Sequence, residues 1–288
     1  MTDQARLPSM LVGLIGEGIQ GSLTPTMHER EAEAQGLRYV YRLIDLVRLG
    51  LTVEALPELL SAAERMGFNG LNITHPCKQA VIPLLHELSD DARAIGAINT
   101  VVLKDGKRIG HNTDWVGFSE PFRRKMADVM RNRVVQLGAG GAAAAVAYAA
   151  LTLGVGQLTI FDVDASRATG LATKLASRFG AERAIAGSDL AKAVGAADGL
   201  INTTPVGMDG HPGMPLSADL LRGDLWVAEI IYFPLETELL KRARALGART
   251  LDGGGMAVFQ AVAAFRLFTG IEPDSERMLA HFAALRRS

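Results

Sequence analysis

Ten consecutive residues encode a strand, a tight turn and the start of a helix: Val134-Val-Gln-Leu-Gly-Ala-Gly-Gly-Ala-Ala143. The apolar run Val134–Leu137 predicts a buried strand, and the alanine-rich run from 142 to 153 predicts a helix. A second apolar run, Leu158–Phe161, predicts the next strand, so the segment has the size of a βαβ unit. A unit of this kind predicts a parallel sheet covered by helices.

The turn inside this unit carries the spacing G-x-G-x-x-G/A at Gly138, Gly140 and Ala143. The first glycine permits the tight turn, the second lets a pyrophosphate approach the backbone, and the small third residue lets helix and strand pack closely. The amides at the start of the helix would bind the pyrophosphate. The alternative is a glycine-rich turn that binds nothing. The predicted dinucleotide-binding residues are Gly138, Ala139, Gly140, Gly141 and Ala142.

Asp162 ends the next predicted strand, 24 positions after Gly138. A carboxylate at this place accepts hydrogen bonds from the adenosine ribose and would repel a 2′-phosphate, so NAD is the predicted cofactor and NADP is disfavoured. The alternative is that Asp162 or Asp164 caps the helix beginning near Ser166. Arg167 complicates the prediction, because a guanidinium nearby could still bind a phosphate.

The composition excludes several classes of function. The chain has 288 residues, enough for two domains, and 48% of them are hydrophobic. A net charge of −1 provides no basic surface for nucleic acid or a membrane. The first residues lack the pattern of a secretory signal, and the single cysteine, Cys77, fits a reducing compartment. We expect a cytoplasmic monomer or homodimer that acts on a small molecule.

Apolar runs alternate with stretches of helical period, which predicts an α/β protein with largely parallel sheets. The dipeptide Asp105-Gly106 predicts a two-residue hairpin turn. The pattern restarts near Arg131, so a boundary is expected near residues 105–115, although the pattern alone would also fit one large sheet. The other expected strands are 10–15, 39–44, 70–73, 97–103, 199–201, 226–230 and 249–251, and the other expected helices are 26–35, 53–65, 76–85, 115–130, 256–268 and 274–286.

Two charged residues stand where helices are expected to begin. Pro76 suits the first turn of a helix that Thr74 or His75 can cap, which places Lys78 near the positive end of the helix dipole. That is an unusual position for a structural lysine, so Lys78 is a candidate acid–base group. Asp114 begins another predicted helix. A solvated lysine and an ordinary N-terminal aspartate are the alternatives.

Other reactive side chains carry weaker signals. His75 and His111 are too isolated in the sequence to predict a metal site. His28 is expected on a helix surface or lining a cleft, and Cys77 is expected to be a small packing residue.

The motifs in their order resemble the shikimate/quinate dehydrogenase family over nearly the whole chain. The N-terminal block Gly16–Pro25 is similar to the loop that binds the substrate carboxylate, and Asn72-Ile-Thr-His-Pro-Cys-Lys78 is similar to the N-x-T-x-P-x-K signature. The later blocks are Ile95–Thr100, Asn112–Asp114, Asn202–Met208, Tyr232–Thr237 and Gly253–Gln260.

The resemblance implies two α/β lobes with the final helices returning to the first lobe, and substrate between the lobes. The implied domains are a substrate domain at 1–112, a Rossmann-like NAD-binding domain at 113–252 and C-terminal helices at 253–288. Lys78 is implied to be the acid–base group, oriented by Asp114. Implied substrate-binding residues are Ser22, Thr24, Asn72, Thr74, Asn99 and Gln260, and further cofactor-binding residues are Thr203, Val206, Tyr232 and Gly255.

Departures from the commonest family pattern favour the NAD-dependent quinate/shikimate branch. Where NADP enzymes carry an asparagine followed by an arginine, this chain has Asp162 and Val163, which removes a phosphate clamp and adds a repulsive charge. Thr24 replaces a serine and His111 replaces an aspartate. Tyr41 could add a hydroxyl to the substrate pocket, or be a core aromatic with a solvated tip.

These features predict NAD-dependent, reversible oxidation of a ring hydroxyl of shikimate and/or quinate to the 3-dehydro ketone. The nearer alternatives are an NADP-dependent shikimate dehydrogenase or a paralogue for a related ring, such as an aminoshikimate. A methylene-folate substrate is disfavoured, since Ser22, Thr24 and Gln260 suit a polyhydroxylated acid. An alternative of another class is a non-catalytic, nucleotide-sensing regulator, which would have little need for Lys78 and Asp114 together.

Overall fold

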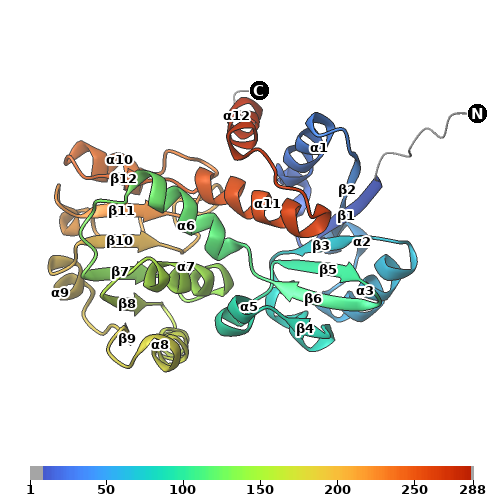
Figure 1. Cartoon of the computed structure of the whole chain (residues 1–288). Coiled ribbons are helices and arrows are strands. Elements are labelled where there is room, and N and C mark those ends of the chain that lie inside the picture. Colours follow the sequence, from blue (N-terminus) through green and yellow to red (C-terminus); the bar gives the residue numbers. More distant parts are fainter. Residues whose placement is uncertain (1–8, 287–288) are drawn as a thin grey trace, which may run out of the picture. The chain divides into compact units, whose positions relative to one another are not determined.

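The computed structural model describes residues 9–286 and divides them into two compact units (Figure 1). The first unit contains the chain up to Thr113 together with the chain from Gln260 onward, and the second contains Asp114–Phe259. The first division falls one residue after the expected 112/113. The second falls inside helix α11 (Gly254–Thr269) instead of at 252/253, because this continuous helix begins in one unit and ends in the other.

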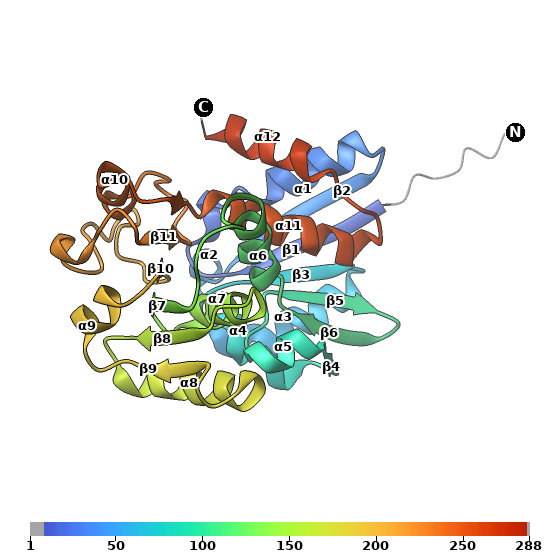
Figure 2. The same cartoon turned by 60° about the vertical axis from the view of Figure 1, so that its left-hand side comes forward.

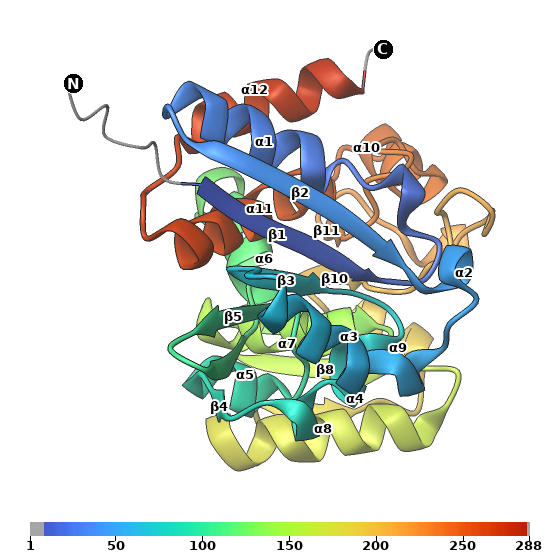
Figure 3. The ribbon, with the colours of Figure 1, turned by 90° about the vertical axis from the view of Figure 1, so that its right-hand side faces the viewer.

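The first unit is built on a six-stranded sheet with the order β2-β1-β3-β5-β6-β4. Strands β1, β2 and β3 are parallel, and β4 is parallel to β6. Strand β5 runs antiparallel to β6, as the expected hairpin requires, and also to β3, a pairing that was not expected. Figure 3 shows β2 beside β1. The strands are β1 Ser9–Gly16, β2 Arg38–Asp45, β3 Gly70–Ile73, β4 Glu87–Leu88, β5 Thr100–Lys104 and β6 Lys107–His111.

The β5–β6 hairpin confirms the turn predicted from Asp105-Gly106. Lys104 pairs with Lys107, and the two turn residues have φ values of 51° and 72°. Positive φ at both central positions is the geometry of a type I′ turn, whose twist matches that of the flanking strands.

Helices cover both faces of this sheet (Figure 3). One of these helices is shorter than expected because of a proline. The helix expected over 76–85 is divided into α4 (Cys77–Ala80) and η3 (Ile82–Leu84), because Pro83 has no N–H to continue the helical hydrogen bonds. Ile15, Leu60 and Leu71 are fully buried in the core beneath. The other helices of this unit are η1 Ile19–Gly21, α1 Thr24–Ala34, α2 Leu46–Leu49, η2 Val53–Ala55, α3 Leu56–Arg65, α5 Asp90–Ile95 and α12 Ser275–Leu285.

The last helix, α12, lies beside α1 (Figure 3). A buried carboxylate on α1 links the two helices. Glu31 is 0% exposed, and its oxygens accept two hydrogen bonds of 2.7 Å from the Arg277 guanidinium. The Asp274 amide and the Gln35 side chain also donate to Glu31. Burial alone would raise the pKa of Glu31, but these hydrogen bonds together lower it.

The second unit is built on six parallel strands with the order β12-β11-β10-β7-β8-β9, which is the Rossmann arrangement. Helix α6 packs beside α7, and α8 runs along β8 and β9 (Figure 2). The elements are α6 Asp114–Lys125, β7 Arg133–Leu137, α7 Gly141–Thr152, β8 Gln157–Phe161, α8 Ala165–Phe179, β9 Ala184–Ala186, α9 Leu190–Gly195, β10 Gly199–Asn202, η4 Ala218–Leu220, β11 Trp226–Glu229, α10 Glu238–Ala245 and β12 Thr250–Leu251.

Strand β9 was not predicted, because Ile185 and Ala186 are exposed and the strand has only three residues. Within the described residues, no helix is both long enough and apolar enough to cross a bilayer.

We predict that Arg277→Met lowers the free energy of unfolding at pH 7 by about 2–3 kcal/mol, because it leaves Glu31 buried without its cation. The matched control is Arg242→Met, which removes an exposed bridge to Glu238 and should cost below about 0.5 kcal/mol. Far-UV circular dichroism in urea is the measurement, since Trp115 and Trp226 both lie in the other unit.

The same pair predicts a pH dependence. The pKa of Glu31 is lowered in the folded state from 4.5, so its contribution is present above that value and is lost as the pH falls through the folded-state pKa. The difference between wild type and Arg277→Met should therefore shrink below pH 4.5. A difference that is equal at pH 7 and pH 4 would contradict this role of Glu31.

Candidate active site

The glycine-rich turn lies at the carboxyl end of β7 and leads into α7. Gly138 has a φ of 98°, and a Cβ on it would lie 2.7 Å from Oγ1 of Thr203, so only glycine fits there. Gly140 precedes the first residue of α7, and a Cβ on it would meet no atom of the described part of the chain within 4 Å. The backbone of Gly140 is therefore open to a ligand, whereas that of Gly138 is packed against Thr203 in the loop after β10.

Two polar side chains hold this turn from beneath. Thr203 donates its hydroxyl to the carbonyl of Leu137 at 2.6 Å, and Gln136 donates from Nε2 to the carbonyls of Gly138 and Ala143 at 3.1 Å each. Gln136 is fully buried, and Oε1 of its amide has no hydrogen-bond partner among residues 9–286. Gln136 was not predicted as a site residue, although a glutamine inside an apolar strand run is a usable signal.

Asp162 follows β8 and contacts the glycine-rich turn. Its Oδ2 accepts the amide of Ala139 at 2.8 Å, and its Oδ1 accepts the amide of Asp164 at 2.9 Å. Helix α8 is capped by Asp164, which accepts the amide of Ser166, so Asp164 and not Asp162 is the capping residue. Each Asp162 oxygen retains lone-pair capacity for a further donor.

The surface beside Asp162 carries more negative than positive charge. Val163 is fully exposed and contributes no charge. Arg167 is paired with Asp164 at 3.5 Å, so its charge is partly neutralised. A phosphate at this place would meet two carboxylates and one guanidinium.

In the first unit, a buried chain of hydrogen bonds joins three strands. The Tyr41 hydroxyl donates to Oδ1 of Asn72 at 2.7 Å, and Nδ2 of Asn72 donates to the Asn99 carbonyl and to Oγ1 of Thr100. Asn99 then donates from Nδ2 to Oγ1 of Thr113 at 2.8 Å and accepts the Thr113 amide at 2.7 Å. This chain fixes the peptide that immediately precedes Asp114.

The chain also defines what its members can offer a ligand. Both N–H groups of Asn72 are used, so only its carbonyl oxygen has capacity left. The Tyr41 tip is not solvated, because the residue is 5% exposed and burial raises the pKa of its hydroxyl well above the usual value.

Lys78 lies in the one-turn helix α4 and is half-buried. The residue before the helix is Pro76, and no side chain that the structure describes caps the helix, so the expected cap by Thr74 or His75 is not formed. A separate backbone hydrogen bond joins α4 to the segment before β5, because the carbonyl of Lys78 accepts the amide of Ile98 at 2.8 Å.

Asp114 is the first residue of α6 and is 6% exposed. Burial, and then the negative charge of Asp114, raises the pKa of Tyr232. Asp114 and Tyr232 therefore lie close enough for their charges to interact. Lys78 belongs to the first unit and Asp114 opens the second, so their pairing stays a prediction.

The remaining candidate residues occupy helix and loop ends. The Ser22 hydroxyl accepts the amide of Thr24, which is the first residue of α1, and Gln260 is the first residue of α11 that belongs to the first unit. Val206 lies in the loop after β10, and Gly255 packs so closely on Pro121 that a Cβ would lie 2.6 Å from it.

One expectation about histidine is wrong. His28 is completely buried, not on a helix surface or a cleft, and its Nδ1 bonds the Tyr39 hydroxyl at 2.9 Å. Its ring lies edge-on to Tyr41, 5.1 Å between centroids, and burial lowers its pKa to about 3. Among the residues that the structure describes, no three His, Cys, Asp or Glu side chains are grouped to hold a metal ion.

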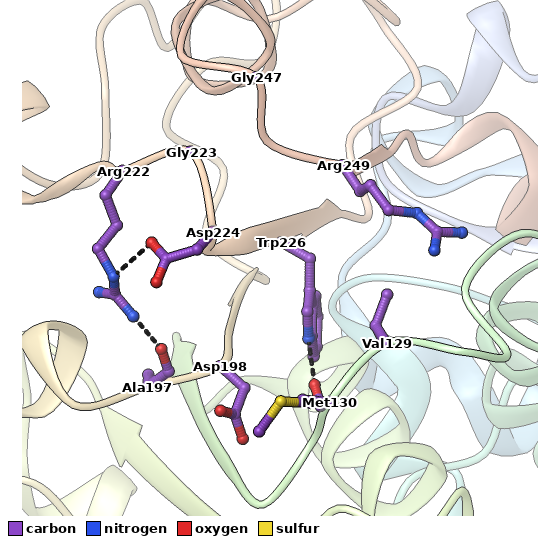
Figure 4. Close-up of a pocket in the computed structure, with 10 residues that line it drawn as sticks. All are labelled: Val129, Met130, Ala197, Asp198, Arg222, Gly223, Asp224, Trp226, Gly247 and Arg249. Carbon is purple, nitrogen blue, oxygen red and sulfur yellow. Dashed lines mark hydrogen bonds and ion pairs between the residues drawn. The ribbon is translucent and has the colours of Figure 1, made fainter.

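A pocket of about 440 Å³ lies in the second unit, at the amino ends of β10 and β11 (Figure 4). Within it, Arg222 contacts Asp224 and the Ala197 carbonyl, and the Trp226 indole donates to the Met130 carbonyl. Ligands of parallel α/β sheets bind at the carboxyl ends of the strands. This pocket is therefore at the opposite edge from the glycine-rich turn.

A Rossmann sheet whose carboxyl edge carries a glycine-rich turn and an acidic strand end defines a dinucleotide-binding class of protein. Comparison with known proteins narrows this class. Residues 14–101 match the shikimate dehydrogenase substrate binding domain, and residues 253–281 match the Shikimate 5'-dehydrogenase C-terminal domain.

Whole-length relatives agree with these matches. A protein named shikimate dehydrogenase (NADP(+)) from Streptomyces avermitilis is 61% identical, with 96% of each chain covered. A protein named quinate/shikimate dehydrogenase (NAD(+)) from Corynebacterium efficiens is 52% identical over 96% of this chain and 99% of the relative. The structure of quinate dehydrogenase from Corynebacterium glutamicum in complex with NAD has a TM-score of 0.91 and 49% identity, covering 96% of this chain and 99% of that one.

The chain therefore belongs to the shikimate dehydrogenase family, which confirms the resemblance predicted from its ordered motifs.

We predict that Tyr41→Phe destabilises the protein by about 1–2 kcal/mol, because it removes the donor of a buried hydrogen bond and leaves Oδ1 of Asn72 unpaired. The matched control is Tyr148→Phe, because the Tyr148 hydroxyl accepts one long hydrogen bond within the described residues, of 3.5 Å from Arg178. Urea unfolding followed by circular dichroism measures both. Equal stability of the two variants would show that the Tyr41 hydrogen bond does not hold the buried chain.

Proposed function

We propose that this protein catalyses the NAD-dependent, reversible oxidation of a ring hydroxyl of shikimate and/or quinate to the 3-dehydro ketone. Membership of the family supports the reaction type, because the relatives carry the names shikimate dehydrogenase and quinate/shikimate dehydrogenase. The observation that carries the cofactor assignment is Asp162, whose carboxylate lies against the glycine-rich turn beside the uncharged Val163.

Asp162 favours NAD for an electrostatic reason. The ribose of NAD offers hydroxyl donors to the free lone pairs of the carboxylate, whereas the 2′-phosphate of NADP would be repelled by it. Asp164 adds a second negative charge and partly neutralises Arg167. The glycine-rich turn would bind the pyrophosphate through the amides at the start of α7.

Lys78 and Asp114 are the proposed catalytic pair. Bound NAD supplies the acceptor for the hydride that leaves the carbinol carbon. The hydroxyl proton passes to Lys78, acting as the base, and returns from its ammonium in the reverse reaction. Asp114, held at the start of α6 by the hydrogen bonds to Thr113, would orient Lys78 and bond the substrate.

The substrate is proposed to bind through hydroxyl and amide groups of the first unit. The Ser22 and Thr24 hydroxyls lie at the N-terminus of α1, where a carboxylate is favoured by the helix dipole. Thr74, Asn99 and Gln260 would bond the ring hydroxyls. Asn72 has only its carbonyl oxygen to offer, and Tyr41 acts on the pocket through Asn72. The extra methyl of Thr24 would lie near the ring carbon at which quinate carries an additional hydroxyl.

A second candidate is an NADP-dependent shikimate dehydrogenase. The 61% identical relative from Streptomyces avermitilis carries that name, and Arg167 is a cation that could bind a phosphate. The two candidates differ in cofactor and agree in the reaction.

Initial rates with both acids and both cofactors distinguish the candidates. We predict a higher kcat/KM with NAD than with NADP. In Asp162→Asn/Val163→Arg, which removes a repulsive charge and adds a cation, the ratio of kcat/KM with NAD to kcat/KM with NADP should fall by about tenfold or more and so favour NADP. Asp198→Asn is the matched control, because Asp198 also accepts a backbone amide but lies at the opposite edge of the sheet. A wild-type preference for NADP would overturn the NAD assignment.

The catalytic pair makes a separate prediction. Lys78→Ala and Asp114→Ala should each lower kcat by about 10²-fold or more, because general acid–base catalysis is lost. Lys107→Ala, which removes an exposed lysine of the same unit, should leave kcat unchanged. Near-normal turnover in both catalytic variants would remove these residues from the mechanism.

A further inference from the structure

Three polar residues are buried together behind the carboxyl edge of the second sheet. Asn202, Glu229 and Thr237 are 0%, 1% and 2% exposed. Asn202 ends β10 and Glu229 ends β11, and the two are directly paired in the parallel register. Their side chains therefore leave the same face of the sheet.

The Glu229 carboxylate accepts one hydrogen bond on each oxygen. Nδ2 of Asn202 donates to Oε1 at 2.7 Å, and the Thr237 hydroxyl donates to Oε2. No basic side chain of the described residues pairs with it. Burial therefore raises the pKa of Glu229, although the two hydrogen bonds oppose this shift. A buried carboxyl without a cation is a costly group, so fold stability alone does not explain it.

The two donors belong to two different loops. Asn202 also organises the loop Thr203–Met208, because its Oδ1 accepts the amide and the hydroxyl of Thr204 and its Nδ2 contacts the Val206 carbonyl. Thr237 accepts the amide of Leu240 and so caps α10, which fixes the end of the segment Ile230–Thr237.

Both loops reach the edge where the dinucleotide is proposed to bind. Thr203 opens the first loop and its hydroxyl contacts the carbonyls of Leu137 and Gly138 in the glycine-rich turn. The second segment begins directly after Glu229, at the carboxyl end of β11, and so starts at the same edge. The residue that follows the first loop also contacts the second segment, since the Asp209 amide donates to the Phe233 carbonyl at 3.0 Å.

We propose that Glu229 is a positioning residue for dinucleotide binding, which through Asn202 and Thr237 holds the loop Thr203–Met208 and the segment Ile230–Thr237 in one arrangement. The proposal rests on the proposed function of this edge. Glu229 does not touch the cofactor in this account. It fixes the loops that do.

The chemistry of the site requires a carboxylate. Two donors, an amide N–H and a hydroxyl, point at the same side chain, and only a carboxylate offers an acceptor oxygen to each. A glutamine has nearly the same shape but would place its NH₂ group against one of the two donors. The Thr237 hydroxyl can turn to accept from that NH₂ group, but its own buried O–H then loses the acceptor that it has in the wild type. The substitution Glu229→Gln therefore weakens one link between the loops without creating a cavity.

The test compares Glu229→Gln with the matched control Glu238→Gln, which makes the same chemical change on an exposed carboxylate near the start of α10. The Kd of NADH, followed by its fluorescence, and the KM of NAD should rise about tenfold in Glu229→Gln. The KM of shikimate or quinate should change by less than about twofold, and all values of Glu238→Gln should match wild type.

Rescue by reversed polarity separates positioning from a general structural defect. In Asn202→Asp/Glu229→Gln the glutamine NH₂ faces a carboxylate, and its carbonyl can accept from Thr237, so the link between the two strand ends is restored. The 3.3 Å contact of residue 202 with the Val206 carbonyl is lost, so the recovery is expected to be partial. Kd for NADH should recover at least threefold relative to Glu229→Gln. Amide hydrogen exchange should be faster within residues 203–208 and 230–237 in the single variant, with the rest of the second unit unchanged.

The outcomes separate this inference from the proposed function. A wild-type protein that binds neither NADH nor NADPH contradicts the proposed function itself. Wild-type binding with an unchanged Kd in Glu229→Gln contradicts the positioning role alone. If Glu229→Gln does not fold, Glu229→Asp, which keeps both acceptors one methylene short, should raise the Kd by a smaller factor, and no rise there contradicts the proposal.

Discussion

The parallel register of four strands is the constraint on which the second unit depends. Leu137 pairs with Phe161 on one side and with Asn202 on the other, and Asn202 pairs with Glu229. Because parallel strands end at the same edge, this register places the glycine-rich turn, Asp162 and the buried Asn202–Glu229 pair in one row. A shift of one residue in β10 would turn Asn202 to the opposite face and separate it from Glu229.

Backbone groups and a few polar side chains give this edge its shape. Gly138 can pack against Thr203 only because it lacks a Cβ. At this close approach the Thr203 hydroxyl donates a hydrogen bond to the Leu137 carbonyl. Asp162 fastens the same turn from the other side through the Ala139 amide. The group that is proposed to select the cofactor therefore also holds the turn that is proposed to bind its pyrophosphate. In the first unit, the hydrogen-bond chain from Tyr41 to Thr113 has a comparable role, since it fixes the strand ends around the candidate substrate residues.

The sequence predicted those features that depend on residues close together in the chain. The Asp-Gly hairpin, the βαβ unit at Val134–Phe161 and the family motifs each depend on a few adjacent residues. The sequence did not predict the antiparallel pairing of β3 with β5, or the burial of His28, because both depend on partners far along the chain. The role of Glu229 was not predicted for the same reason, because its hydrogen-bond partners Asn202 and Thr237 are 27 and 8 positions away. The sequence shows a glutamate at the end of an apolar strand, but it does not show which two side chains donate hydrogen bonds to it.

Direct titration of the unmodified protein with NADH and NADPH, at one fixed ionic strength, is the most direct test of the account. Two carboxylates beside an uncharged Val163 predict a lower Kd for NADH than for NADPH, by about tenfold or more. The advantage should decrease as salt is added, because it is electrostatic. Equal or tighter binding of NADPH would contradict the role given to Asp162, on which the cofactor assignment depends.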